Sequence, residues 1–107
     1  MRSKRNLDPL AQIGRLVKVL RGKDEGSCAI IIGLIDDRFV LIADGDARRF
    51  DSPKKKNIQH LQLLPALSSE VSDSMSETGR VTNAKLRFVI QKYADRKENE
   101  DGQGRRH

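Results

Sequence analysis

Lysine and arginine side chains are grouped in the first 65 residues, where their spacing indicates phosphate binding. Lys54, Lys55 and Lys56 are adjacent after Pro53, so they can reach different phosphates of one polyanion. Taken alone, such a triplet is equally compatible with a solvated loop. Further cations surround it, and the candidate phosphate-binding residues are Arg15, Lys18, Arg21, Lys23, Arg48, Arg49, Lys54, Lys55, Lys56 and His60.

The overall charge supports a polyanionic partner. The 107 residues carry 21 Lys and Arg against 15 Asp and Glu, a net charge of +6. Residues 1–65 hold 13 cations and 8 acids, or +5, and residues 66–107 hold 8 and 7, or +1. A basic half of this kind most often binds nucleic acid. The alternative is a protein of alkaline isoelectric point without such a partner.

The types and spacing of the residues do not match those of a catalytic or metal-binding site. Cys28 is the one cysteine, lies in an apolar run and is expected to be a small buried side chain. No cysteine pair is available for zinc. In a calcium loop counted from Asp44, Arg49 and Lys55 would occupy positions that require Gly and Glu. We therefore expect no enzyme, no catalytic residues, no metal and no cofactor.

The aromatic residues limit how nucleic acid could be bound. The chain has three Phe, one Tyr and no Trp. Phe39 and Phe50 fall in predicted strands and are expected in the core, whereas Phe88 lies about 200° around its helix from Leu86. Few stacking platforms favour recognition of the phosphates and shape of structured RNA. Phe88 is either a singly exposed side chain or a contact for a partner.

Short apolar runs with tight turns predict a small β-domain over residues 11–65. We expect strands around residues 16–20, at 28–35, at 39–43, at 47–50 and at 58–64. Asp44 and Gly45 would form a type I′ turn before the fourth strand, and residues 51–57 would be a basic loop. Five such strands suggest a small barrel or sandwich.

The remainder is predicted to be helical. Leu67, Val71 and Met75 are spaced for one helix that Gly79 would end. Thr82 or Asn83 would cap a second helix, from residue 84 to about 96. The expected organisation is a flexible basic arm at 1–10, the β-domain at 11–65, a helical extension at 66–96 and a disordered tail at 97–107.

The longest apolar run has eight residues, against about 20 for a membrane helix, so we expect no membrane partner. One cysteine favours a reducing compartment, the cytoplasm.

Residues 14–31 resemble a KOW motif, which is two strands around a basic loop that carries a glycine. The chain also resembles a bacterial family of KOW-domain RNA-binding proteins, and this resemblance extends over residues 41–45, 53–61 and 81–87. These are similar to KOW-type large-subunit ribosomal proteins of archaea and eukaryotes. The resemblance implies an SH3-like five-stranded barrel that binds RNA on or near the ribosome. It matches Gly26 to the motif glycine, and Arg21 and Lys23 to the basic loop, where Asp24 and Glu25 are a departure.

The leading prediction is a monomeric, non-enzymatic RNA-binding protein, a ribosomal or ribosome-associated component whose partner is ribosomal RNA on the large subunit. The alternative is a protein–protein adaptor that docks on a translation or transcription complex. Since successive loops of an up-and-down barrel alternate between its ends, residues 21–26 and Asp44–Gly45 would share one end. Residues 54–56 would then share the other end with Asp36 and Asp37.

Overall fold

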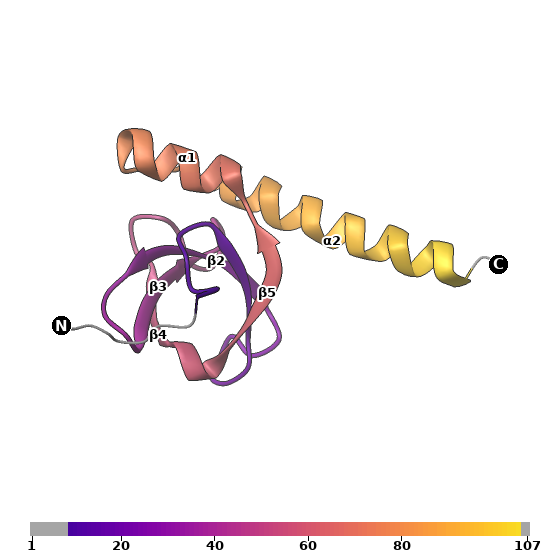
Figure 1. The fold of residues 1–107 in the computed structure, drawn as a ribbon, viewed down its shortest axis with the longest axis horizontal. Coiled ribbons are helices and arrows are strands. Elements are labelled where there is room, and N and C mark those ends of the chain that lie inside the picture. The colour runs from indigo at the N-terminus through magenta and orange to yellow at the C-terminus, as the bar shows by residue number, and fades with distance from the viewer. Residues whose placement is uncertain (1–8, 106–107) are drawn as a thin grey trace.

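A computed structural model describes residues 9–105, with side chains described as far as residue 96. The chain folds into one five-stranded sheet and two helices (Figure 1). Neighbouring strands are antiparallel throughout, in the order β4-β3-β2-β1-β5. The strands are β1 (Arg15–Val19), β2 (Cys28–Leu34), β3 (Phe39–Ala43), β4 (Lys54–Asn57) and β5 (Leu61–Leu67).

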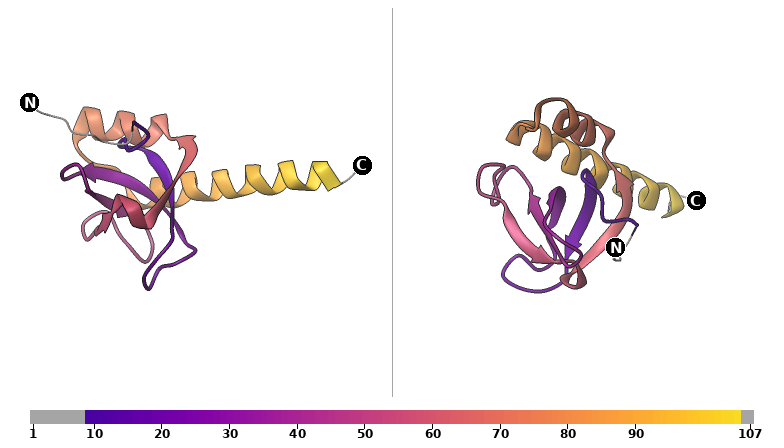
Figure 2. Two further views of the ribbon diagram at one scale, coloured as in Figure 1. Left: turned by 60° about the horizontal axis from the view of Figure 1, so that its bottom comes forward. Right: turned by 60° about the vertical axis from the view of Figure 1, so that its left-hand side comes forward.

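The sheet is strongly curled, as Figures 1 and 2 show from three directions. Its edge strands β4 and β5 are joined by the one-turn 3₁₀ helix η1 (Ile58–His60). Within residues 9–105, β4 and β5 do not pair with each other. The predicted combination of a five-stranded antiparallel sheet with two helices is confirmed, and closure into an SH3-like barrel stays a prediction.

Alternating side chains give the curled sheet two apolar faces. Val17, Val19 and Ile31 are fully or almost fully buried on the inner face. Their neighbours Leu16 and Ile30 point to the outer face, into a second core that the helices cover. Both faces of the central strands are therefore shielded from water, as the long apolar run in β2 predicts.

The two helices begin and end where the sequence places their caps. In α1 (Ser69–Thr78), Gly79 follows the last turn with φ +77° and donates its N–H to Met75 O. In α2 (Asn83–Arg105), the Thr82 hydroxyl accepts the Lys85 N–H at 3.0 Å. Leu86 is fully buried against the sheet, which contributes about 1.5–3 kcal/mol. α1 and the first half of α2 lie over the outer face of the sheet, and the rest of α2 extends beyond it (Figure 2).

The position of the fourth strand was predicted wrongly. The structure places it at Lys54–Asn57, where we expected a loop, and leaves residues 47–50 outside the sheet. Asp44 does not adopt the positive φ of a type I′ turn, and its carboxylate instead accepts the Asp46 and Arg48 N–H groups in a wider turn. Phe50 is then held by the helices, because its N–H donates to Asn83 Oδ1 at 2.7 Å.

Element boundaries also differ near the second half of the chain. β5 continues through Pro65 to Leu67, and Pro65 falls where the pairing of this edge strand with β1 is irregular, a place that tolerates proline. α2 continues past residue 96 to Arg105, since no Pro interrupts it and its two glycines, Gly102 and Gly104, lie only in its last turn. The basic arm falls mostly, and the end of the tail entirely, outside the described residues, so both stay predictions. Neither described helix is long and apolar enough to cross a membrane.

Candidate nucleic-acid interface

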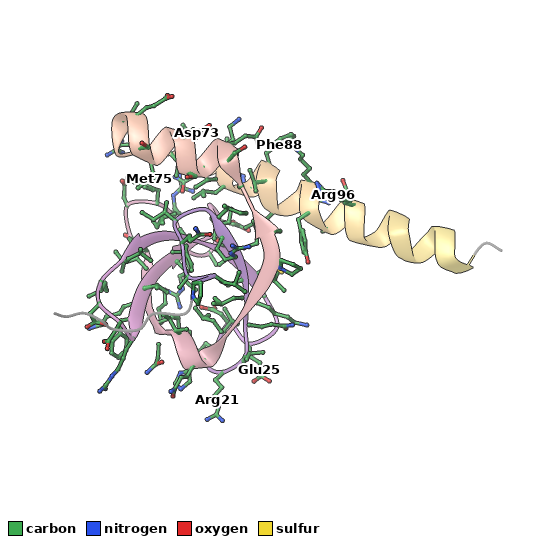
Figure 3. All side chains as sticks on the ribbon, in the orientation of Figure 1. Arg21, Glu25, Asp73, Met75, Phe88 and Arg96 are labelled. Atoms are coloured by element: carbon green, nitrogen blue, oxygen red, sulfur yellow. The ribbon has the colours of Figure 1, made fainter. Side chains whose placement is uncertain are left out.

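The loop between β1 and β2 is an ordered turn that presents the KOW-like residues. Gly22 and Gly26 have φ of +101° and +90°, a backbone conformation that favours glycine. The Gly26 N–H donates to Val19 O at 2.7 Å, and the Glu25 N–H donates to Gly22 O at 3.1 Å. These bonds fix the loop on the end of the hairpin, where Arg21 and Glu25 project outward (Figure 3).

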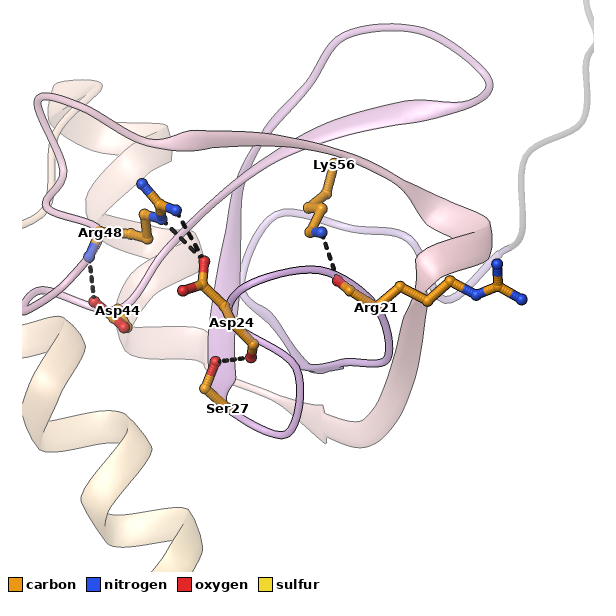
Figure 4. Close-up of polar contacts among 6 residues, drawn as sticks. All are labelled: Arg21, Asp24, Ser27, Asp44, Arg48 and Lys56. Atoms are coloured by element: carbon orange, nitrogen blue, oxygen red, sulfur yellow. Dashed lines mark hydrogen bonds and ion pairs between the residues drawn. The ribbon is translucent and has the colours of Figure 1, made fainter.

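Asp24, inside this loop, is paired with Arg48 from the turn that follows β3. Its Oδ2 lies 3.0 Å from one terminal guanidinium nitrogen of Arg48 and 3.1 Å from Nε (Figure 4). Both side chains are about a quarter to a third exposed, at 25% and 31%. The predicted proximity of residues 21–26 to the Asp44–Gly45 turn is thereby confirmed, and Arg48 compensates one of the two acids in the loop.

Lys56 reaches the same loop from the neighbouring edge strand. Its Nζ donates to Arg21 O at 2.8 Å (Figure 4), and it would lie only 2.9 Å from a Cβ added at Gly22. His60 flanks the start of the loop, because its carbonyl accepts the Leu20 N–H at 2.8 Å. Residues 54–56 form a strand beside β3 and not the expected loop, and the Lys56 side chain reaches the β1–β2 loop although its backbone pairs with Val40 near the β2–β3 turn. The expected closeness of these lysines to Asp36 holds for Lys55, which contributes to the lowered pKa of Asp36.

These contacts bring four cations together around one loop. We define the loop surface as the side chains of Arg21, Lys23, Arg48 and Lys56. With Asp24 and Glu25 included, the group has four positive and two negative charges, a net of +2. Arg21 and Lys23 are exposed. A rigid loop with exposed cations can bind phosphates without reordering its backbone.

Arg15 has a structural role and does not belong to the loop surface. It is only 7% exposed. Its Nε donates to Leu10 O at 2.8 Å, and its terminal nitrogens donate to Leu64 O at 3.2 Å and Gln12 Oε1 at 2.9 Å. The guanidinium thus ties the segment before β1 to β5, and a phosphate could not reach it without breaking these bonds.

The remaining predicted cations are distributed around the sheet. Lys18 is exposed on β1, on the face opposite Val17 and opposite Gln62 of β5. Lys54 and Lys56 share one face of β4, whereas Lys55 lies on the other with its Nζ 4.7 Å from the centre of the Phe39 ring. Arg49 is exposed in the segment before β4. The structure therefore brings only some of the predicted cations together at the β1–β2 loop and distributes the others around the sheet.

Arg38 is an exposed cation that sequence reasoning passed over. It follows Asp36 and Asp37 in the β2–β3 turn, and these acids made the turn look merely structural. Asp36 Oδ1 accepts the backbone N–H groups of Arg38 and Phe39 at 2.8 and 2.9 Å. These two bonds lower the pKa of Asp36, with smaller contributions from Lys55 and Arg38.

The described residues offer little for metal or thiol chemistry. Over this part of the chain, no three His, Cys, Asp or Glu side chains are grouped as metal ligands. Cys28 is half-buried and packs against the outer core of the sheet. The side chains best placed to bind a partner are thus the cations on the β1–β2 loop, which suit a phosphate-rich molecule.

Comparison with known proteins places these features in a family, although no family model matches the chain. The Bacillus subtilis protein named "Putative ribosome-binding protein YbzG" is 49% identical over 71 residues, which are 66% of this chain and 96% of that protein. The large ribosomal subunit protein eL14 of Hyperthermus butylicus is 32% identical over 91 residues, 78% of this chain and 93% of that protein. The eL14 protein of Saccharolobus islandicus is 27% identical over 92 residues, 77% and 94% of the two chains. The chain therefore belongs to the bacterial branch of the KOW-type ribosomal protein family that includes archaeal eL14.

Proposed function

We propose that the protein binds ribosomal RNA of the large subunit through phosphate contacts made by the loop surface. The family supports a ribosomal partner, because one relative is named for ribosome binding and others as large-subunit proteins. The observation that carries the proposal is the loop surface itself, where Arg48 and Lys56 converge on the loop that holds Arg21 and Lys23.

The arrangement favours electrostatic binding by a preformed surface. Arg48 neutralises Asp24, so the acid that departs from the KOW pattern does not face a phosphate alone. Arg21 and Lys23 are left exposed to contact phosphates. Each phosphate contact releases condensed counterions, so affinity falls as salt rises. Such contacts set the position and orientation of RNA more than they read its sequence.

Several finer features belong to the same proposal. The curled sheet acts as an SH3-like barrel of the KOW type, with the β1–β2 loop at its RNA-binding end. Lys18, Arg49, Lys54, Lys55 and His60 extend the contact at the margins of the loop surface. The protein acts as a monomer in the cytoplasm, bound to the ribosome, and catalyses no reaction.

Salt-dependent binding to a large-subunit RNA fragment tests the proposal. Reversing both exposed loop cations, Arg21→Glu with Lys23→Glu, should weaken binding and reduce the slope of log K against log salt by about 1.4–1.8 for two lost phosphate contacts. Arg80→Glu is the control charge reversal, since Arg80 lies between α1 and α2 and contacts Asp51 and the Phe50 ring instead of the β1–β2 loop. Equal losses in both variants, or an unchanged slope in the double variant, would remove the loop surface from the site. Binding that scarcely depends on salt would favour the adaptor function.

A further inference from the structure

Phe88 is the most exposed large apolar side chain in the described part of the chain. It is 53% exposed on the outward side of α2, while Leu86 on the same helix is fully buried (Figure 3). The core therefore does not require an aromatic residue at this position. Figure 3 shows Phe88 at the helical side of the molecule, away from Arg21 on the loop surface.

Two lysines accompany the ring on the same helix face. Lys85 and Lys92 are three residues before and four residues after Phe88, which places all three side chains together. Their Nζ atoms lie 5.8 and 5.6 Å from the ring centre. Each Nζ is also 3.9 Å from a carboxylate oxygen of Glu70 in α1, a separation at the outer limit for an ion pair. A phosphate could therefore replace Glu70 as their partner.

The part of α2 that carries this cluster is mainly cationic. Between residues 83 and 96, α2 carries four cations and one acid, Asp95. Of the four, Arg87 is engaged, since it donates to Gly45 O at 2.7 Å. Lys92 also borders a groove of about 490 Å³ between β5, α1 and α2, which is lined by Tyr93 and Arg96 among others. This volume is within the range of about 300–1,000 Å³ that holds small ligands.

This combination fits a nucleic-acid base better than an apolar protein partner. The other exposed large apolar side chains of the described residues are not on α2, so Phe88 is not part of an apolar stripe along this helix. An apolar partner would have to remove water from the lysines without compensating their charge. A nucleotide provides both a ring that stacks on Phe88 and a phosphate that pairs with the lysines.

We propose that Phe88 is a stacking platform for an unpaired base of RNA, with Lys85 and Lys92 binding the adjacent phosphates. The proposal rests on RNA being the partner, and it adds a second contact on the helical side. Structured RNA would bind at the loop surface, and a single-stranded segment would bind at α2. Glu70 holds the two lysines beside the ring until a phosphate displaces it.

A tryptophan at this position reports base stacking directly. The chain contains no Trp, so Phe88→Trp introduces a single tryptophan, whose emission can be excited apart from that of Tyr93, on an exposed site that the core does not use. Titration with a ten-residue oligoadenylate RNA should quench its emission in a saturable manner. Phe88→Leu should weaken binding of the oligonucleotide by about 5- to 160-fold, the usual range for loss of one stacked base. Glu70→Gln should strengthen it, because the lysines lose their competing carboxylate.

The outcomes separate this proposal from the function proposed above. If the oligonucleotide binds but the Trp emission and the Phe88→Leu affinity are unchanged, the stacking platform is refuted. If a large-subunit RNA fragment still binds in a manner sensitive to Arg21→Glu with Lys23→Glu, the loop surface stands without it. If neither RNA binds, both proposals fail. Quenching by the oligonucleotide with loss of affinity in Phe88→Leu would support the platform.

Discussion

Because Asp24 pairs with Arg48, we predict that a substitution of Asp24 tightens RNA binding. Asp24→Asn removes the charge that occupies Arg48 but keeps an oxygen that can accept from the guanidinium. Arg48 then becomes available for a phosphate, and the net charge of the loop surface with its two acids rises from +2 to +3.

The expected gain follows from counterion release. One additional phosphate contact steepens the slope of log K against log salt by about 0.7–0.9. Relative to 1 M salt, where this contribution vanishes, affinity at 0.1 M should therefore rise by about five- to eightfold. The ion pair is one-quarter to one-third exposed, so its loss should cost only about 0.5–1 kcal/mol of stability. This corresponds to a fall in Tm of about 2–8 °C.

Filter binding to a large-subunit RNA fragment across a salt series measures the affinity and the slope together. Glu25→Gln is the matched control, because it removes one charge from the same loop at an exposed residue with no ion pair among the described side chains. Asp24→Asn should exceed this control in both affinity and slope. A variant that binds more weakly than the unmodified chain would show instead that the pair is needed to hold the loop in its binding conformation, and would refute the reasoning.

Three further predictions concern the scaffold. Arg15→Leu should destabilise the fold by about 2–4 kcal/mol in denaturant unfolding, since its guanidinium makes three buried or half-buried bonds, while leaving the salt slope of RNA binding unchanged; a changed slope would return Arg15 to the interface. Gly45→Ala should lower the free energy of unfolding more than Gly26→Ala does. Both glycines have positive φ, but a Cβ at Gly45 would collide with Asn83 O, whereas open space surrounds Gly26. We expect about 1–2 kcal/mol at Gly26 and more at Gly45 by thermal unfolding, and equal losses would contradict the packing of this turn against α2. The pKa of Asp36 should lie below the 3.8 of an unperturbed aspartate, so its stabilising effect should be complete above that pH and be lost as the pH falls through the lowered value; an NMR titration of its carboxyl at or above 3.8 would contradict the turn geometry.

Local patterns in the sequence predicted most elements correctly. The apolar runs on either side of Asp36 and Asp37 form the β2–β3 hairpin, and Gly79 and Thr82 mark helix boundaries as expected. These features depend on neighbours within a few residues, so the sequence carries them directly. The apolar side of α2 that packs against the sheet was likewise visible as a helical repeat.

Long-range contacts account for what the sequence did not reveal. Three consecutive lysines resemble a loop by composition, yet as edge strand β4 they pair with β3 through backbone bonds that any residue can make. Charged side chains on an edge strand also discourage pairing with other molecules. The contacts of Asp24 with Arg48 and of Lys56 with Arg21 span 24 and 35 residues, and no local pattern encodes them. Nor does any local signal distinguish the buried Arg15 from its exposed neighbour Lys18.

The central claim is that this protein binds ribosomal RNA electrostatically, and sedimentation of a cell lysate tests it most directly. Fractions of a sucrose gradient would be probed for the protein at low salt and at about 0.5 M salt, where charges are screened beyond a few ångströms. We predict that the protein migrates with the large subunit or its precursors at low salt and is released at high salt. Migration at the top of the gradient in both conditions would contradict stable binding to the ribosome.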